Sequence, residues 1–215
     1  KQGNKEAAGA ALDSLMNDLR DKQVSLFYLR CMCFDLINTF LLLAVLTIAA
    51  WWGGGAPPIR LRQQPGLLIG SIAAALVGML ILGASGGITA LGDTLLLTAG
   101  IMPEESPLVA TLVDLRIYHP LLAFVVGGLN LLAVYVARLL RPSPAITRLG
   151  WILGGVYVLQ LIIGALNVAL KAPVAIQLIH LLISDSIWIT LVLLAMNALA
   201  VDVAEAAIDD THTHP

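Results

Sequence analysis

Five long apolar stretches constrain this chain more than any other feature of its sequence. A helix that crosses the hydrocarbon of a bilayer needs about 17–25 predominantly apolar residues. The stretches that reach this length are residues 36–52, 67–84, 121–137, 149–170 and 174–201. The first four carry no charged side chain, and the fifth contains His180 and Asp185. The sequence therefore predicts an all-α integral membrane protein with five transmembrane helices, surrounded by a lipid bilayer.

The composition excludes the main alternatives. Apolar residues make up 59% of the chain and charged residues 12%, whereas soluble domains have about 45–50% and about 25%. The net charge of -2 is spread thinly, without a basic stripe, so we expect no nucleic-acid partner. A soluble enzyme is excluded because one core of this size could not bury so much apolar surface.

Arginine residues predict the orientation in the membrane. They follow the first and third stretches, at Arg60, Arg62, Arg138, Arg141 and Arg148. Loops rich in Lys and Arg remain in the cytoplasm. We therefore expect residues 85–118 to form a polar outer loop and the turn at Lys171 to lie on the outer side as well.

The ends of the chain are expected to lie outside the bundle. Residues 1–30 are polar and fall on the outer side, residues 31–201 form the transmembrane bundle, and residues 202–215 form an acidic cytoplasmic tail. Apolar residues at helical spacing in Glu6–Arg30 fit a helix at the membrane surface, and a partly ordered tail is the alternative. No signal peptide is recognisable, so we expect further hydrophobic sequence upstream.

Two hairpins repeat one pattern, and each contains a histidine. Leu82-Gly83-Ala84 precedes an outer loop and His119, and Ile163-Gly164-Ala165 precedes a shorter turn and His180. Membrane folds built from repeats place their sites at the repeat interface. Both histidines are expected near the outer edge of the hydrocarbon. A lone histidine in this position is usually an interfacial residue, but two in equivalent places point to a shared ligand.

Two imidazoles suit one kind of metal centre better than the others. Structural zinc requires four protein ligands, and no cysteine or carboxylate aligns with His119 and His180. Haem needs only two axial ligands, because the porphyrin supplies the other four. We therefore expect an iron site in which the C-terminal four helices form a haem-binding bundle around His119 and His180.

Small residues and nearby cations add to this hypothesis. Ala123 and Gly127 share the helix face of His119 and would admit a flat macrocycle. The alternative is a small-xxx-small pair for helix packing. Arg116, one turn before His119, and Lys171 are candidate partners for the haem propionates, with interfacial snorkelling as the alternative.

Three further polar residues have weaker assignments. Asp185, within the fifth stretch, indicates either a proton relay or a protonated group bonded to a neighbouring helix. Cys31 and Cys33 are expected to be structural thiols.

Several segments resemble the haem A synthase family of cytochrome oxidase assembly proteins. They are residues 83–94, 116–120 and 164–188, with Asn38–Leu43 and the Trp pair 51–52 in support. The resemblance implies that the five stretches match the fourth to eighth of the family's eight spans. It also implies that His119 and His180 match the pair that holds a haem b. The family's other half oxidises a methyl group of haem O, and there Asp35 stands where the family has a histidine.

The resemblance implies a function and leaves an alternative open. We expect a haem A synthase-like oxidoreductase in haem A biosynthesis, converting haem O to haem A for cytochrome oxidase assembly. This chain would supply the half that binds haem b and transfers electrons. Missing N-terminal spans or a partner subunit would supply the rest. The alternative is a non-catalytic haem b-binding subunit of a respiratory or photosynthetic membrane complex. A transporter fits less well, because it needs a polar site at the midplane.

Overall fold

The computed structural model describes residues 34–200 except 60, 62, 63, 99 and 105, together with residues 27 and 30. The expectations for the N-terminal segment, for the two cysteines, for Arg60 and Arg62 and for the C-terminal tail lie outside the described residues. The described residues divide into two compact units, the first containing residues 84–119 and the second residues 37–83 and 120–200.

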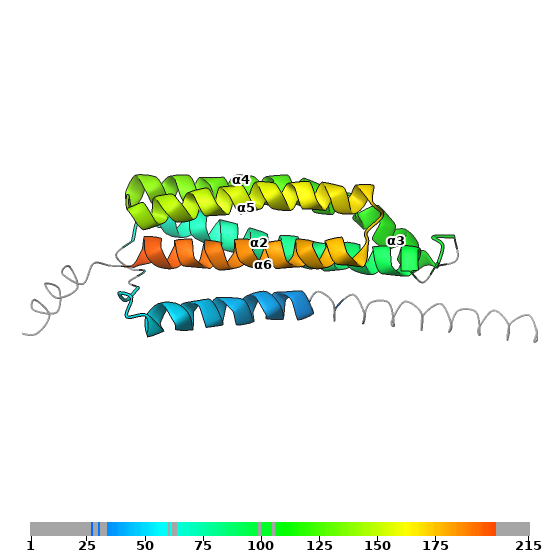
Figure 1. Cartoon of the computed structure of the whole chain (residues 1–215), viewed down its shortest axis with the longest axis horizontal. Coiled ribbons are helices and arrows are strands. Elements are labelled where there is room, and N and C mark those ends of the chain that lie inside the picture. Colours follow the sequence, from blue (N-terminus) through cyan, green and yellow to red (C-terminus); the bar gives the residue numbers. More distant parts are fainter. Residues whose placement is uncertain are drawn as a thin grey trace, which may run out of the picture. The chain divides into compact units, whose positions relative to one another are not determined.

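Helices make up nearly all of the described structure (Figure 1). They are Phe34–Gly53, α2 (Gly66–Asp93), α3 (Pro107–Leu115), α4 (Tyr118–Leu140), α5 (Pro144–Ala169) and α6 (Val174–Leu199), with a π-helix over Thr94–Thr98. Among the described residues, five helices are long and apolar enough to cross a membrane. The predicted all-helical membrane fold with five spans is confirmed.

Local sequence explains where helices begin and turn. Ser143 accepts a hydrogen bond at Oγ from the backbone N–H of Ile146 (3.1 Å), and Pro144 opens α5, a position where its missing N–H costs nothing. The turn into α6 is tight, since Lys171 and Ala172 have φ values of 58° and 55°. The backbone N–H of Ala172 donates to the carbonyl of Asn167 at 2.8 Å.

Close approaches between helices build the core of the second unit. Gly78 of α2 lies against Val126 of α4, because a Cβ there would stand 3.3 Å from its Cγ2. Gly150 of α5 lies closer still to Val134 of α4, since a Cβ there would be 2.7 Å from Cγ1. Small residues at such contacts let membrane helices approach closely. In Figure 1, α4 and α5 accordingly run side by side.

The helix Phe34–Gly53 packs onto α6 through one aromatic pair. The rings of Phe40 and Trp188 stack with centroids 5.1 Å apart. The indole Nε1 of Trp188 also donates to the carbonyl of Phe40 at 2.6 Å. Both residues are buried, so the pair forms part of the apolar core between this helix and α6.

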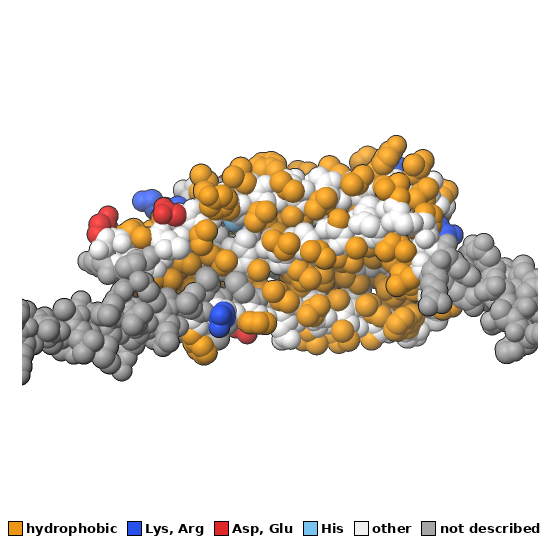
Figure 2. All heavy atoms as spheres, turned by 180° about the vertical axis from the view of Figure 1, so that it is seen from behind, with side chains coloured by type: hydrophobic (Ala, Val, Ile, Leu, Met, Phe, Trp, Pro, Cys, Tyr) orange, Lys and Arg blue, Asp and Glu red, His pale blue; other side chains and the backbone are white. Residues whose placement is uncertain are grey.

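Apolar side chains also cover the outside of the helices. Phe124 and Leu131 of α4 are 69% and 65% exposed, and hydrophobic atoms dominate the surface seen in Figure 2. A helix that is apolar all round fits a bilayer. The arrangement agrees with a protein whose exposed faces contact lipid.

The expected polar outer loop is wrong in extent. α2 continues to Asp93, a π-helix follows to Thr98, and α3 covers Pro107–Leu115. Residues 85–92 are uncharged, and membrane helices tolerate glycine better than soluble ones do. The glycines at 86 and 87 therefore do not end the helix.

Candidate functional site

The first candidate ligand, His119, lies in the first unit beside the last turns of α2. Its Nδ1 is 2.8 Å from the hydroxyl Oγ of Ser85. Gly86 lies directly against the imidazole, since a Cβ at this position would be 3.2 Å from Cε1 of His119. Any larger residue would crowd the ring, so glycine at 86 makes the space in which the imidazole sits.

The second candidate ligand, His180, has a matching environment in the second unit. A Cβ at Gly164 of α5 would be 3.2 Å from Cε1 of His180, the same distance as at Gly86. Gln160, one turn earlier on α5, donates from Nε2 to the backbone carbonyl of His180 at 3.0 Å. Each histidine therefore rests on a glycine of the preceding long helix.

This glycine contact corrects the alignment of the two hairpins. The sequence pattern paired Gly83 with Gly164, but Gly83 packs against the ring of Phe40, with a Cβ position 2.8 Å from Cε2. Gly86 takes the equivalent place instead. Sequence reasoning missed both Ser85 and Gly86. The sequence signal was the uncharged stretch after Ala84, which indicates that α2 continues far enough for its residues 85 and 86 to contact His119.

Arg116 has a partner within its own unit. Its Nη1 donates to Oδ1 of Asp93 at 2.7 Å, and the Arg116 side chain remains 39% exposed, compared with 12% for Asp93. This ion pair ties the end of α2 to the residue that follows α3. In this arrangement the guanidinium is already paired with a carboxylate, although its exposed part leaves room for a second anion. The other candidate cation, Lys171, is exposed.

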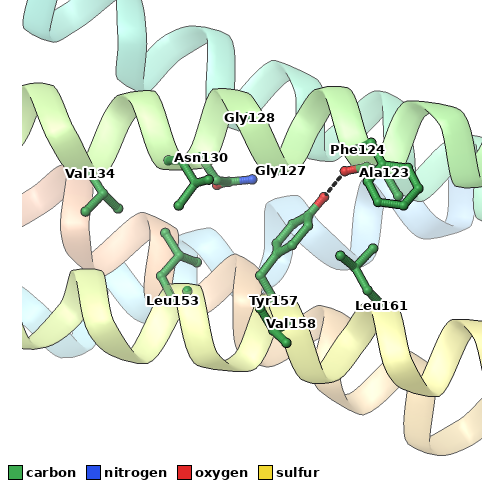
Figure 3. Close-up of a pocket in the computed structure, with 12 residues that line it drawn as sticks. Ala123, Phe124, Gly127, Gly128, Asn130, Val134, Leu153, Tyr157, Val158 and Leu161 are labelled. Atoms are coloured by element: carbon green, nitrogen blue, oxygen red, sulfur yellow. Dashed lines mark hydrogen bonds between the residues drawn. The ribbon is translucent and has the colours of Figure 1, made fainter.

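Ala123 and Gly127 pack against α5. The hydroxyl of Tyr157 donates to the carbonyl of Ala123 at 2.6 Å, and a Cβ at Gly127 would be 2.8 Å from Cε1 of the same tyrosine. Figure 3 shows the tyrosine reaching from α5 to α4. This is the geometry of the helix-packing alternative. A macrocycle against Gly127 would require Tyr157 to move.

A mostly apolar cavity of about 290 Å³ lies beside this contact, between α4 and α5 (Figure 3). Asn130 lines it and is 3% exposed. Its Nδ2 donates to the carbonyl of Val126, while its Oδ1 is buried without a hydrogen bond. The walls suit a hydrocarbon chain better than a charged ligand.

The described residues offer few side chains that could bind a metal ion. In that part of the chain no group of three or more His, Cys, Asp and Glu side chains could hold a metal ion. Asp185 forms no hydrogen bond or ion pair with another described residue. The described residues therefore do not form a site in which four protein side chains hold a metal.

Comparison with known proteins gives two results. Residues 21–192 match the model of a family described as cytochrome oxidase assembly protein. Two curated relatives, from two strains of Thermus thermophilus, are 45% and 44% identical over 172 residues, and both are named protoheme IX farnesyltransferase. The match covers 76% of this chain but 28% of each relative. No solved structure matches the chain.

Proposed function

This chain belongs to the cytochrome oxidase assembly protein family, and we propose that it is the haem b-binding half of a haem A synthase-like enzyme, with His119 and His180 as the axial ligands. The family supports a role in cytochrome oxidase assembly.

One observation carries the proposal. Two histidines on different helices have the same support, a glycine whose Cβ position is 3.2 Å from the imidazole Cε1. Glycines also lie against the packed rings of Phe40 and Tyr157, so the support for a shared ligand comes from the repetition of one contact, at the same distance and the same ring atom, on both histidines. An axial ligand must be held in one orientation for Nε2 to reach iron.

The chemistry of the donors agrees with haem. Two neutral imidazoles complete the coordination of a porphyrin iron. A bound haem b would supply a one-electron redox centre. This chain's own residues would hold and orient it. Gly86 and Gly164 give space to the rings, and Arg116 offers its exposed edge to a propionate while Asp93 fixes its position.

The names of the relatives support a role for this chain in the reaction that follows haem farnesylation. Protohaem IX is haem b, and its farnesylated product, haem O, is the substrate whose methyl group a haem A synthase oxidises. The chain spans less than a third of those relatives' length. We therefore assign to it only the haem-binding part of such chemistry, in the bacterial cytoplasmic membrane with the haem toward the outer face.

The alternative of a non-catalytic haem b subunit in a respiratory or photosynthetic complex is favoured by one observation. The described residues contain one pair of histidines, and a substrate haem needs a second pocket of its own. The two proposed functions have the same haem site, and they differ in whether haem O is oxidised.

The test measures haem content by pyridine haemochrome in purified protein. We expect one haem b per chain in the native sequence and its loss in His119→Ala or His180→Ala, since either change removes an axial ligand. His212→Ala, a change in the C-terminal tail, is the control and should retain full haem. Retention of haem by both ligand variants would overturn the assignment.

A further inference from the structure

We infer that Ser85 is a positioning residue that holds His119 in the tautomer with its proton on Nδ1. The inference rests on the proposed function only for its effect on haem. The geometry is one hydrogen bond of 2.8 Å between Ser85 Oγ and Nδ1, beside the contact of Gly86 with Cε1 of the same ring. Adjacent residues of α2 therefore fix both the orientation and the hydrogen bonding of the imidazole.

The direction of the hydrogen bond follows from the behaviour of hydroxyl groups in membrane helices. In this chain Ser71, Thr89 and Thr94 of the same segment each donate to a backbone carbonyl three or four residues earlier, at 3.0, 3.1 and 2.8 Å. Serine and threonine in helix interiors regularly bond in this way. When Ser85 bonds in the same way, its hydroxyl proton goes to a carbonyl of its own helix, and its oxygen presents a lone pair to His119.

That neighbour must then be the donor. A neutral imidazole has one N–H and one lone pair. If Nδ1–H donates to Ser85, the lone pair lies on Nε2, the nitrogen farther from the backbone. The serine therefore selects the tautomer that can bind iron through Nε2.

The hydrogen bond also tunes the ligand. An N–H donated to an oxygen makes the opposite ring nitrogen a stronger electron donor, which stabilises ferric over ferrous iron. Loss of such an outer partner typically costs about 10–100-fold in metal affinity. We expect Ser85→Ala to weaken haem binding by about tenfold and to shift the midpoint potential of the haem to a more positive value.

The environment explains why water would not replace the hydroxyl. Ser85 and His119 are both partly buried in a segment that belongs to a candidate membrane span. Their partial burial limits the room for a water molecule that could take the place of the hydroxyl. The ring of an alanine variant therefore loses a defined partner and exchanges between tautomers.

The experiment uses the full chain in detergent micelles, with and without haem. Nitrogen NMR of ¹⁵N-histidine-labelled protein without haem reports the tautomer of each ring, and the His119 signals are assigned by their loss in His119→Gln. We expect protonated Nδ1 in the native sequence, a tautomer mixture in Ser85→Ala and recovery in Ser85→Thr. Ser71→Ala is the matched control, because it removes a hydroxyl from the same helix without touching a histidine.

The outcomes separate this inference from the proposed function. The native tautomer in Ser85→Ala, or protonated Nε2 in the native sequence, overturns the role of Ser85 whether haem binds or not. The expected tautomers in a protein that binds no haem would support the role of Ser85 and contradict the proposed function. An unchanged midpoint potential in haem-loaded Ser85→Ala would overturn the tuning of the ligand.

Discussion

Replacing Gly164 by larger residues tests whether the glycine makes room for an axial ligand. The Cβ of Gly164→Ala would stand 3.2 Å from Cε1 of His180, so the ring would have to shift by a few tenths of an ångström. Gly164→Val adds two further methyl groups against the same ring. Overpacking of this kind costs about 1–3 kcal/mol.

In the haem-free variant the ring of His180 can turn away from the added methyl groups, so the part of this cost that lowers haem affinity is the part met when binding returns the ring to its place. Because about 1.4 kcal/mol corresponds to a factor of ten in a binding constant, Gly164→Val should weaken haem binding by up to about 150-fold. Gly164→Ala should have a smaller effect in the same direction. The assay is titration of the protein without haem by haem in detergent, followed by the Soret absorbance.

Gly155→Val is the matched control. Gly155 is on the same helix, is exposed, and has no neighbouring atom within 4 Å of its Cβ position. The change in helix propensity is the same at both sites, so the ratio of the two affinities isolates the contact with His180. Native affinity in Gly164→Val, or equal losses in both variants, would refute the reasoning.

Three further predictions follow from other parts of the structure. Gly127→Leu should displace Tyr157, break its bond to Ala123 and lower stability by about 1–3 kcal/mol, measured by thermal unfolding in detergent. Full haem occupancy in that folded variant would assign Gly127 to helix packing alone. Ala172→Gly should stabilise the chain by about 0.5–1 kcal/mol, because it relieves a left-handed φ; chemical unfolding measures this, and lower stability would contradict it. Expressed in a host that makes haem O but lacks its own synthase, the chain should accumulate no haem A on chromatography, since the residues that the structure describes contain one pair of histidines, His119 and His180. Haem A would show that this half suffices.

The sequence predicted the transmembrane helices well, because length and apolar composition determine which segments a bilayer accepts. The helices Phe34–Gly53, α4 and α5 begin or end within a few residues of the uncharged stretches. The end of α2 was misplaced because glycines normally signal a turn. In an apolar segment that rule fails, so the loop between α2 and α4 is shorter than predicted.

The candidate site was predictable only in part. The histidines were identifiable because ionisable residues are rare in membrane spans. Their supporting residues were not, because a contact such as Gly86 with His119 depends on how far α2 extends. The Ser85 hydrogen bond follows from the same extension. At Ala123 and Gly127 the sequence suggested space for a haem, but in the structure the side chain of Tyr157 fills that space.

Electron paramagnetic resonance of the oxidised, purified protein tests the central claim most directly. Two imidazole ligands make ferric haem six-coordinate and low-spin, so we predict the low-spin signal of a bis-histidine haem. His119→Ala and His180→Ala should each convert it to a high-spin signal or remove it. A high-spin signal from the native sequence, or no haem signal in folded protein supplied with haem, would contradict the account.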